Sequence, residues 1–299
     1  MRIRKGVIPV AGHGVRLFPA TKAVKKELFP LVDRTGSIKP IVQMIIEEAL
    51  ASGIEQVCIV VQPGGDELIR RYFCDPLPPD FDSRIGQSPD AHAEYQRLRQ
   101  LGEHINYVFQ QTQEGYGHAV YCARQWVGEE PFLLLLGDHV YLSATGDRCA
   151  RQLIDAFEVT RMSTSGVVRT PESMLQYFGT IAGKPDARLP GLYAVTDIVE
   201  KPTVEYARAH LRVEGITEGS YLSWFGLHAF TPEIFECIEY HIRNNLREKG
   251  EIQLTTAQEL LRRRRNSYYA YEVKGVRCDI GIPSEYARTM ALMAGLSEP

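Results

Sequence analysis

The stretch GVIPVAGHGVR, residues 6–16, decides the fold prediction. It reads as a buried strand, Gly6 to Val10, that runs directly into a turn containing Gly12 and Gly14, with Arg16 just behind it. Glycine has no Cβ, so the backbone N–H groups of such a turn can come close to an anion. A glycine turn after a first strand therefore predicts an α/β protein that holds a phosphate group at this point.

The residues that follow alternate between strand and helix patterns. Apolar residues at helical spacing predict a helix over Pro40 to Ser52, and β-branched residues predict a strand over Gln56 to Val61. Further strands are expected at Ile105 to Phe109 and Phe132 to Leu136, while Pro76 to Asp90 is expected to be a loop. This alternation predicts a mostly parallel central sheet flanked by helices.

The pattern changes after about Asp147. Shorter strands and further helices follow, which predict smaller β elaborations in the second half. The sequence has no repeat and no linker-like segment, so we expect residues 1–299 to form a single domain.

Composition limits the classes of function. The net charge is −3, which gives no electrostatic reason to expect a nucleic acid as partner. No apolar run approaches the roughly 20 residues that a membrane span needs. The six cysteines are scattered without a Cys-x-x-Cys pair, so we expect reduced thiols in a cytoplasmic protein rather than a zinc site or a disulfide framework.

The glycine turn does not fit a dinucleotide-binding fingerprint. That fingerprint requires a third glycine where Leu17 stands and an acidic residue where Gln62 follows the second strand. Basic residues instead follow the turn, namely Arg16, Lys22, Lys25 and Lys26. They favour a triphosphate or a leaving pyrophosphate over a nicotinamide cofactor, which makes a dehydrogenase the weakest alternative.

Two aspartates follow apolar segments. Asp138 comes directly after the run Leu133 to Leu136, and Asp279 lies between apolar neighbours and a glycine. A carboxylate in such a place is costly to desolvate unless it is paired or bound to a metal. Mg²⁺ binds through one or two carboxylates together with substrate phosphates, so the pair predicts a Mg²⁺ site. The alternative is that Asp138 caps a turn.

Other polar residues at strand ends allow two interpretations each. Gln110 ends a strand and could read a base edge through its amide, or could simply be solvated. Glu200 and Lys201 precede a proline and could bind a sugar hydroxyl and a phosphate, although composition alone favours a surface turn.

Taken together, these residues resemble the bacterial UTP–glucose-1-phosphate uridylyltransferases within the sugar-nucleotidyltransferase family. The resemblance covers nearly the whole chain, in order. The matching segments are residues 7–33, residues 39–61, Gln110 with Gly115 to Val120, Gly137 with Asp138, Tyr177 to Gly179, Val199 to Pro202, Gly250 to Thr255, and Asp279.

The resemblance implies a Rossmann-like α/β fold and a Mg²⁺-dependent transfer of a nucleotidyl group from a nucleoside triphosphate to a sugar 1-phosphate. It also implies residues 1–146 as a nucleotide-binding half, residues 147–299 as a sugar-phosphate and oligomerisation half, and a homo-oligomer. The implied catalytic residues are Arg16, Lys26 and Lys201; the implied nucleotide-binding residues are Ala11, Gly12, Gly14, Gln110 and Gly115; the implied sugar-binding residues are Gly179, Glu200 and Lys201; the implied metal ligands are Asp138 and Asp279.

The sequence departs from the family pattern at several points. Val15 replaces a threonine, Lys25 replaces a proline, about five residues are inserted around Thr35 to Lys39, and Glu114 stands where a basic residue is usual. The expected substrates are UTP and glucose 1-phosphate. Another triphosphate such as dTTP or CTP, another sugar, or a non-catalytic sugar-nucleotide-binding protein remain alternatives.

Overall fold

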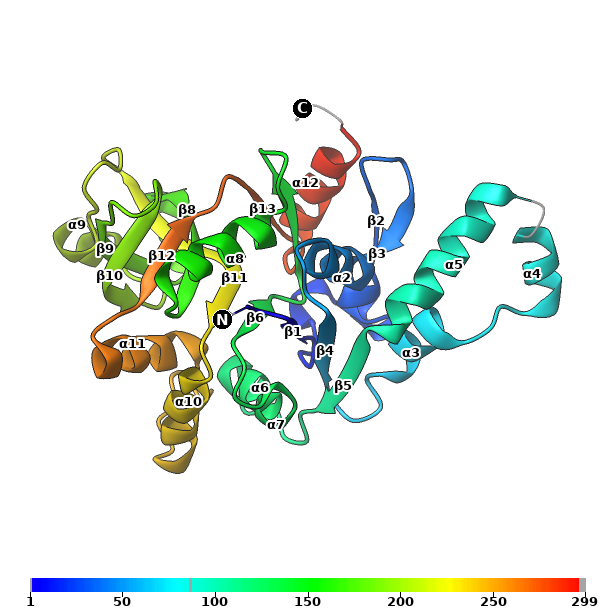
Figure 1. The fold of residues 1–299 in the computed structure, drawn as a ribbon, viewed down its shortest axis with the longest axis horizontal. Helices are drawn as coiled ribbons and strands as arrows, with labels where there is room; N and C mark the ends of the chain where they lie inside the picture. Colours follow the sequence, from blue (N-terminus) through cyan, green and yellow to red (C-terminus); the bar gives the residue numbers. More distant parts are fainter. Residues whose placement is uncertain (1, 86–87, 296–299) are drawn as a thin grey trace.

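The computed structural model describes residues 2–85 and 88–295 and places a nine-stranded sheet at its centre (Figure 1). In spatial order the strands are β5 (Ile105–Phe109), β4 (Gln56–Val61), β1 (Lys5–Pro9), β6 (Phe132–Leu135), β11 (Ser220–Phe230), β8 (Thr164–Pro171), β12 (Tyr269–Glu272), β10 (Leu192–Val199) and β9 (Thr180–Pro185).

The sheet is mixed rather than mostly parallel. The strands β5, β4, β1 and β6 run parallel, as expected from the alternation of strands and helices. From β11 onward most neighbours are antiparallel, including β11 with β6 and β10 with β9. Antiparallel neighbours can be joined by short turns, and the second half has few helices between its strands, so the expectation of parallel pairing does not extend to it.

Helices cover both faces of the sheet. Figure 1 shows α6, α10 and α11 below the strands and α2 and α12 above them. The helices are α1 (Ala20–Ala23), α2 (Ile41–Ala51), α3 (Glu67–Cys74), α4 (Pro79–Ile85), α5 (Pro89–Glu103), α6 (Tyr116–Cys122), α7 (Arg124–Val127), α8 (Cys149–Thr160), α9 (Val204–His210), α10 (Glu233–Arg243), α11 (Leu254–Arg265) and α12 (Pro283–Met293). In the part of the chain that the structure describes, no helix is long and apolar enough to cross a membrane.

The segment expected to be a loop, Pro76 to Asp90, contains helix α4. The prediction weighed its prolines and aspartates as breakers. Here Pro79 is the first helical residue, where its missing N–H costs nothing, and Asp80 and Asp82 lie in the first turn, where they complement the helix dipole.

The core explains why the first strands are continuously apolar. Along β1, Ile8 packs into one buried cluster with α2 and α8, while Val7 packs into another with α6, α10 and α11. The same alternation holds for Leu133 and Leu134 on β6. Side chains alternate across a strand, so a strand that is covered on both faces is apolar at every position.

Two short pairings were not predicted from the sequence. Strand β7 (His139–Ser143) pairs with β13 (Gly275–Asp279) in antiparallel register, with Asp279 opposite His139. Strands β2 (Pro30–Val32) and β3 (Ile38–Pro40) form a small hairpin. The first pairing matters for the site because it brings the end of the chain back to the carboxyl end of β6.

Candidate functional site

The parallel strands end at one edge of the sheet, where the predicted site residues gather. The amide of Val10 donates to the carbonyl of Val60 over 2.8 Å, and the amide of Gln110 donates to the carbonyl of Val61 over 2.8 Å. At Gly137, an added Cβ would lie 2.6 Å from the carbonyl oxygen of Pro9. The ends of β1, β4, β5 and β6 are therefore in contact, as the strand-end argument requires.

The two aspartates meet. Because β13 lies beside β7, the amide of Ile280 donates to the carbonyl of Asp138 over 2.9 Å. The potential ligand atoms of Asp138, His139 and Asp279 all lie within 4.8 Å of one another. Carboxylate oxygens at this spacing are the hard ligands that Mg²⁺ prefers, so the residues present fit such an ion.

Asp138 is held as an anion by its neighbours. Burial on its own would raise the pKa of Asp138, but Lys26 and His139 lower that pKa well below its usual range. The ammonium of Lys26 lies 2.6 Å from Oδ2, and Nδ1 of His139 lies 2.9 Å from Oδ1. The site thus contains the fixed negative charge of Asp138. It also contains the cation of Lys26, which could leave Asp138 and bind a phosphate instead.

Arg16 reaches the same point from the glycine turn. The position of an added Cβ on Gly281 would be 2.9 Å from Nη2 of Arg16 and 3.1 Å from oxygens of both Asp138 and Asp279. Gly14 has a positive φ of 65°, which favours glycine, and its carbonyl accepts from the amide of Leu17 over 3.0 Å. Arg16 thereby comes to lie over the paired aspartates.

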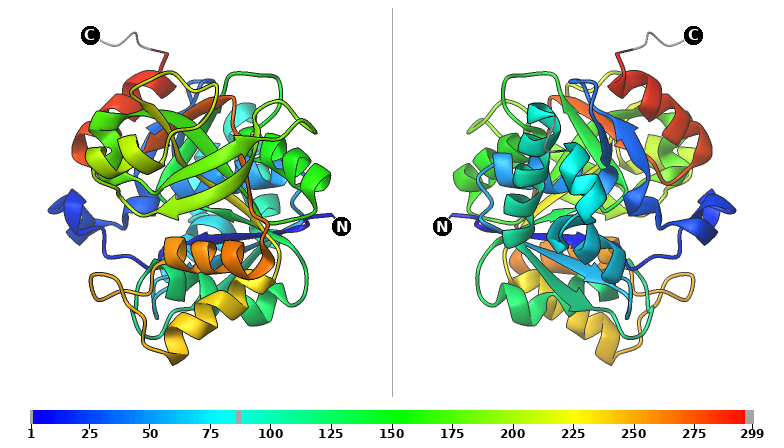
Figure 2. Two further views of the ribbon diagram at one scale, coloured as in Figure 1. Left: turned by 90° about the vertical axis from the view of Figure 1, so that its left-hand side faces the viewer. Right: turned by 90° about the vertical axis from the view of Figure 1, so that its right-hand side faces the viewer.

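The turn itself is open. At Gly12 an added Cβ would meet no atom within 4 Å, and the residue is exposed. Figure 2 shows the dark-blue segment that carries α1 standing out from the body of the protein. Behind the turn, Ala11 is buried and its carbonyl accepts from Nε2 of Gln113 over 2.9 Å. The backbone around Gly12 is therefore accessible to a large ligand.

The amide orientation of Gln110 follows from its contacts. Its nitrogen lies 3.2 Å from the carbonyl oxygen of Gly115 and 3.0 Å from Nδ1 of His118. A carbonyl only accepts hydrogen bonds, so the group that faces it must be the amide nitrogen. The oxygen of Gln110 then remains as an acceptor for a ligand.

Gly115 adjoins Gln110 and packs against a distant motif. It has φ +112°, and an added Cβ would lie 2.7 Å from Cβ of Glu251 and 2.8 Å from the carbonyl oxygen of Ile252. The amide of Ile252 donates to the carbonyl of Glu114 over 2.7 Å. No side chain fits here, so the glycine at this position has a structural reason.

A cavity of about 220 Å³ lies between the paired aspartates and the second half of the chain. Predicted residues from both halves line it, namely Arg16, Asp138, Gly179, Glu200, Lys201 and Asp279. The other predicted residues, Ala11, Gly12, Gly14, Lys26, Gln110 and Gly115, are not among its lining residues. Oε2 of Glu200 accepts from the hydroxyl of Thr255 over 2.7 Å, and its Oε1 lies 3.4 Å from the ammonium of Lys201. Glu200 and Lys201 are thus part of the wall of this cavity, on a bend in which Lys201 is exposed.

The structure also shows residues that the sequence interpretation missed. Arg277 lies two residues before Asp279 on β13, so both project from the same face of that strand. Its guanidinium lies 3.6 Å from the ring centre of Phe178 and donates to the carbonyl of Trp224. Burial lowers the pKa of Arg277 to about 10, which leaves it charged at neutral pH. The alternation of a strand that ends in Asp279 could have identified it.

Three of the four departures from the family pattern can be followed in the structure, and the fourth, Val15, is exposed. Lys39 is buried and pairs with Asp33 over 3.1 Å, so the inserted hairpin is anchored by an ion pair. Glu114 pairs with Arg247. The ammonium of Lys25 has no hydrogen-bond partner among the described residues and lies 2.6 Å from the position of an added Cβ at Gly65.

Comparisons with known proteins agree with this geometry. The pattern of the family described as Nucleotidyl transferase matches residues 5–294. The chain is 35% identical to the UTP–glucose-1-phosphate uridylyltransferase of Bacillus subtilis (strain 168) over 285 residues, which cover 94% of this chain and 87% of that protein. It is also 35% identical to UTP–glucose-1-phosphate uridylyltransferase 2 of Staphylococcus saprophyticus, over 96% of this chain and 91% of that one.

Solved structures give the same result. A crystal structure of UDP-glucose pyrophosphorylase complexed with UDP-glucose superposes with a TM-score of 0.77 at 26% identity, covering 97% of this chain and 98% of the other. The UTP-bound enzyme of Acinetobacter baumannii superposes with a TM-score of 0.78 at 28% identity, covering 99% and 95%. The chain therefore belongs to the nucleotidyl transferase family.

Proposed function

We propose that this protein is a Mg²⁺-dependent uridylyltransferase that converts UTP and glucose 1-phosphate into UDP-glucose and pyrophosphate. The observation that carries the proposal is the meeting of Lys26, Asp138 and Asp279 between the glycine turn and the cavity of the second half. Relatives that bear this name match nearly the whole chain at 35% identity, which supports the choice of nucleotide and sugar.

The chemistry is an in-line displacement at phosphorus. An oxygen of the sugar phosphate attacks the α-phosphorus of UTP, the bond between the α- and β-phosphates breaks, and pyrophosphate leaves. No protein nucleophile is needed, because the protein positions the reactants and neutralises charge. Asp138 and Asp279 are the residues that would hold Mg²⁺, whose chemistry is to offset the charge of the reacting phosphates.

The first half, residues 1–146, holds the nucleotide in this proposal, on the Rossmann-like run of parallel strands. Backbone groups around Ala11, Gly12 and Gly14 contact the triphosphate, and Arg16 contacts the departing pyrophosphate. Lys26 leaves its partner Asp138, 2.6 Å away, and contacts a phosphate. Gly12 is exposed and an added Cβ there would meet no atom within 4 Å, so the turn leaves the nucleotide room to enter.

Base selection follows from the orientation of Gln110 beside Gly115. Its amide nitrogen is engaged by the protein, which leaves its oxygen to accept a hydrogen bond. Uracil and thymine carry an N3–H donor, whereas N3 of cytosine is an acceptor. The site should therefore prefer UTP or dTTP over CTP, whose donor on this edge is the exocyclic amine and not N3.

The second half, residues 147–299, holds the sugar phosphate. Gly179 and Glu200 contact sugar hydroxyls, and Lys201 contacts the phosphate. A cytoplasmic location is also part of the proposal, because the six cysteines are scattered in the sequence without a Cys-x-x-Cys pair. A homo-oligomer, with an interface in this half, remains part of the proposal on the strength of the family resemblance.

The test is pyrophosphate release with Mg²⁺ and glucose 1-phosphate, measured in parallel with UTP, dTTP, CTP, ATP and GTP. We expect release with UTP above all others and less with CTP. Release with a different triphosphate would keep the mechanism and change the substrate. No release with any triphosphate, nor with other sugar 1-phosphates, would contradict the proposal and favour a non-catalytic sugar-nucleotide-binding protein.

A further inference from the structure

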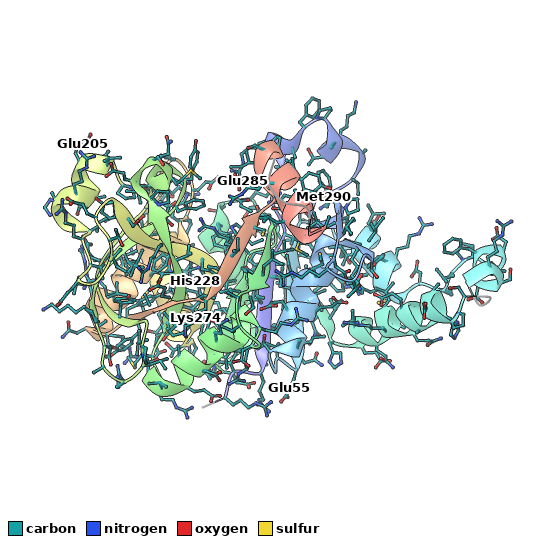
Figure 3. All side chains as sticks on the ribbon, turned by 90° about the horizontal axis from the view of Figure 1, so that it is seen from above. Glu55, Glu205, His228, Lys274, Glu285 and Met290 are labelled. Carbon is teal, nitrogen blue, oxygen red and sulfur yellow. The ribbon has the colours of Figure 1, made fainter. Side chains whose placement is uncertain are left out.

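Strand β11 forms one wall of the cavity in the second half. Trp224, Gly226 and His228 all line this cavity, as expected for alternate residues that share one face of a strand. Figure 3 labels His228 among the side chains of this half. These residues line the same cavity as Glu200 and Lys201, and the proposed function gives them no role.

Trp224 carries a donor that has no partner. Its Nε1 is buried and has no hydrogen-bond partner among the described residues. An indole N–H can only donate, and buried donors are nearly always paired in folded proteins. An unpaired donor in the wall of a ligand cavity indicates that the ligand supplies the acceptor.

Gly179 brings this donor close to a carboxylate, because both lie beside its Cα. The Cβ position would be 2.5 Å from Nε1 of Trp224 and 2.9 Å from Oε2 of Glu200. The same small region thus faces an N–H donor and a carboxylate acceptor. A hydroxyl group accepts one hydrogen bond and donates another, so it suits both partners at once.

Both partners are held in place. The amide of Trp224 donates to the carbonyl of Gly179 over 2.9 Å, and the hydroxyl of Thr255 donates to Oε2 of Glu200 over 2.7 Å. The indole also makes an edge contact with the ring of His228, at 5.6 Å between ring centres.

His228 is itself anchored on the side away from the indole. Its Nδ1 lies 2.6 Å from the hydroxyl of Ser165 and 3.1 Å from Nε2 of Gln258. The ring against which Trp224 rests is therefore fixed by buried hydrogen bonds, and little ordering is left for ligand binding to supply.

We propose that Trp224 is a specificity-determining residue for the sugar acceptor: its indole N–H donates to a hydroxyl of the sugar that in turn donates to Glu200. The inference rests on the proposed function and names a contact that selects among sugar 1-phosphates. It implies that the enzyme discriminates by about tenfold, through this contact, against a sugar 1-phosphate that lacks this hydroxyl.

The test compares Trp224→Phe with Trp126→Phe, which alters the other tryptophan of the chain, on α7. Each protein is assayed with UTP and with glucose 1-phosphate or its 2-, 3-, 4- and 6-deoxy analogues. Trp224→Phe should lower kcat/KM for glucose 1-phosphate by about tenfold, because a hydrogen bond is lost, with the KM for UTP unchanged. For the one deoxy analogue that lacks the contacted hydroxyl, Trp224→Phe and the wild type should have the same kcat/KM. Unchanged discrimination against all four analogues would overturn the proposal.

A binding measurement separates this inference from the proposed reaction. In Trp126→Phe protein, Trp224 is the remaining tryptophan, so its emission reports on its own surroundings. Adding glucose 1-phosphate in the presence of UDP should change this emission saturably, whether or not the protein turns over. An emission spectrum that does not change would overturn the proposed contact of Trp224. This measurement does not use Trp224→Phe, so it tests the proposal even if that variant fails to fold. Absence of turnover with a saturable emission change would contradict only the proposed reaction.

Discussion

Glu27 provides the sharpest prediction, because its carboxylate is buried next to the site and its charge is only partly stabilised by its neighbours. It lies in the short 3₁₀ turn Lys26–Leu28 and is fully buried. Neither carboxylate oxygen has a hydrogen-bond partner among the described residues. The charged groups that affect it are Lys25, Lys26 and Asp138. Burial raises the pKa of Glu27 from 4.5 to about 7, and the lysines offset only part of that increase.

The sign and size of the effect follow from proton linkage. The Glu27 carboxyl loses its proton near pH 4.5 in the unfolded chain and near pH 7 in the folded protein. Between these pH values the folded protein therefore binds more protons than the unfolded chain. The free energy of unfolding therefore falls with rising pH across this window, and the contribution of Glu27 is intact only below it. At about 1.4 kcal/mol per pKa unit, the loss is roughly 3 kcal/mol at pH 8.

The substitution Glu27→Gln removes the titrating group and keeps its shape. The free energy of unfolding of Glu27→Gln minus that of the wild type should increase by roughly 3 kcal/mol from pH 4.5 to pH 8. Urea unfolding at both pH values measures this difference, with the exposed Glu129→Gln as the matched control. A difference between wild type and Glu27→Gln that stays the same at both pH values would refute the reasoning.

Three further substitutions test the site. Asp138→Ala should abolish Mg²⁺-dependent pyrophosphate release while circular dichroism remains native. The surface control Asp147→Ala should keep activity near the wild-type level. Activity near that level in Asp138→Ala would show the metal assignment to be wrong. Lys201→Ala should raise the KM for glucose 1-phosphate at least tenfold with little change for UTP, because it removes a charge-assisted contact; equal kinetics for the sugar phosphate would contradict its role. Gly115→Ala should destabilise the fold by about 1–3 kcal/mol and weaken UTP binding, because φ is +112° and the new Cβ would lie 2.7 Å from Glu251; a native urea midpoint and KM for UTP would refute this.

Much of the architecture is predictable from local pattern. The bounds expected for β4 and β5 are those observed, because their apolar pattern and flanking residues are strong and local. Gln110 and Asp138 were identified because polar residues at the ends of parallel strands share one edge of the sheet. The order of the matching segments along the chain was also enough to predict the family.

What the sequence by itself determined, then, was the family and the chemical identity of the strand-end residues. Only the tertiary structure decided that Asp279 meets Asp138, that β11 joins the sheet in antiparallel orientation, and that Trp224 leaves a donor unpaired beside Glu200. Periodicity reports which face of a strand is buried, since that is a property of neighbouring residues. The choice of partner strand depends on packing between segments far apart in the chain, which local pattern does not contain.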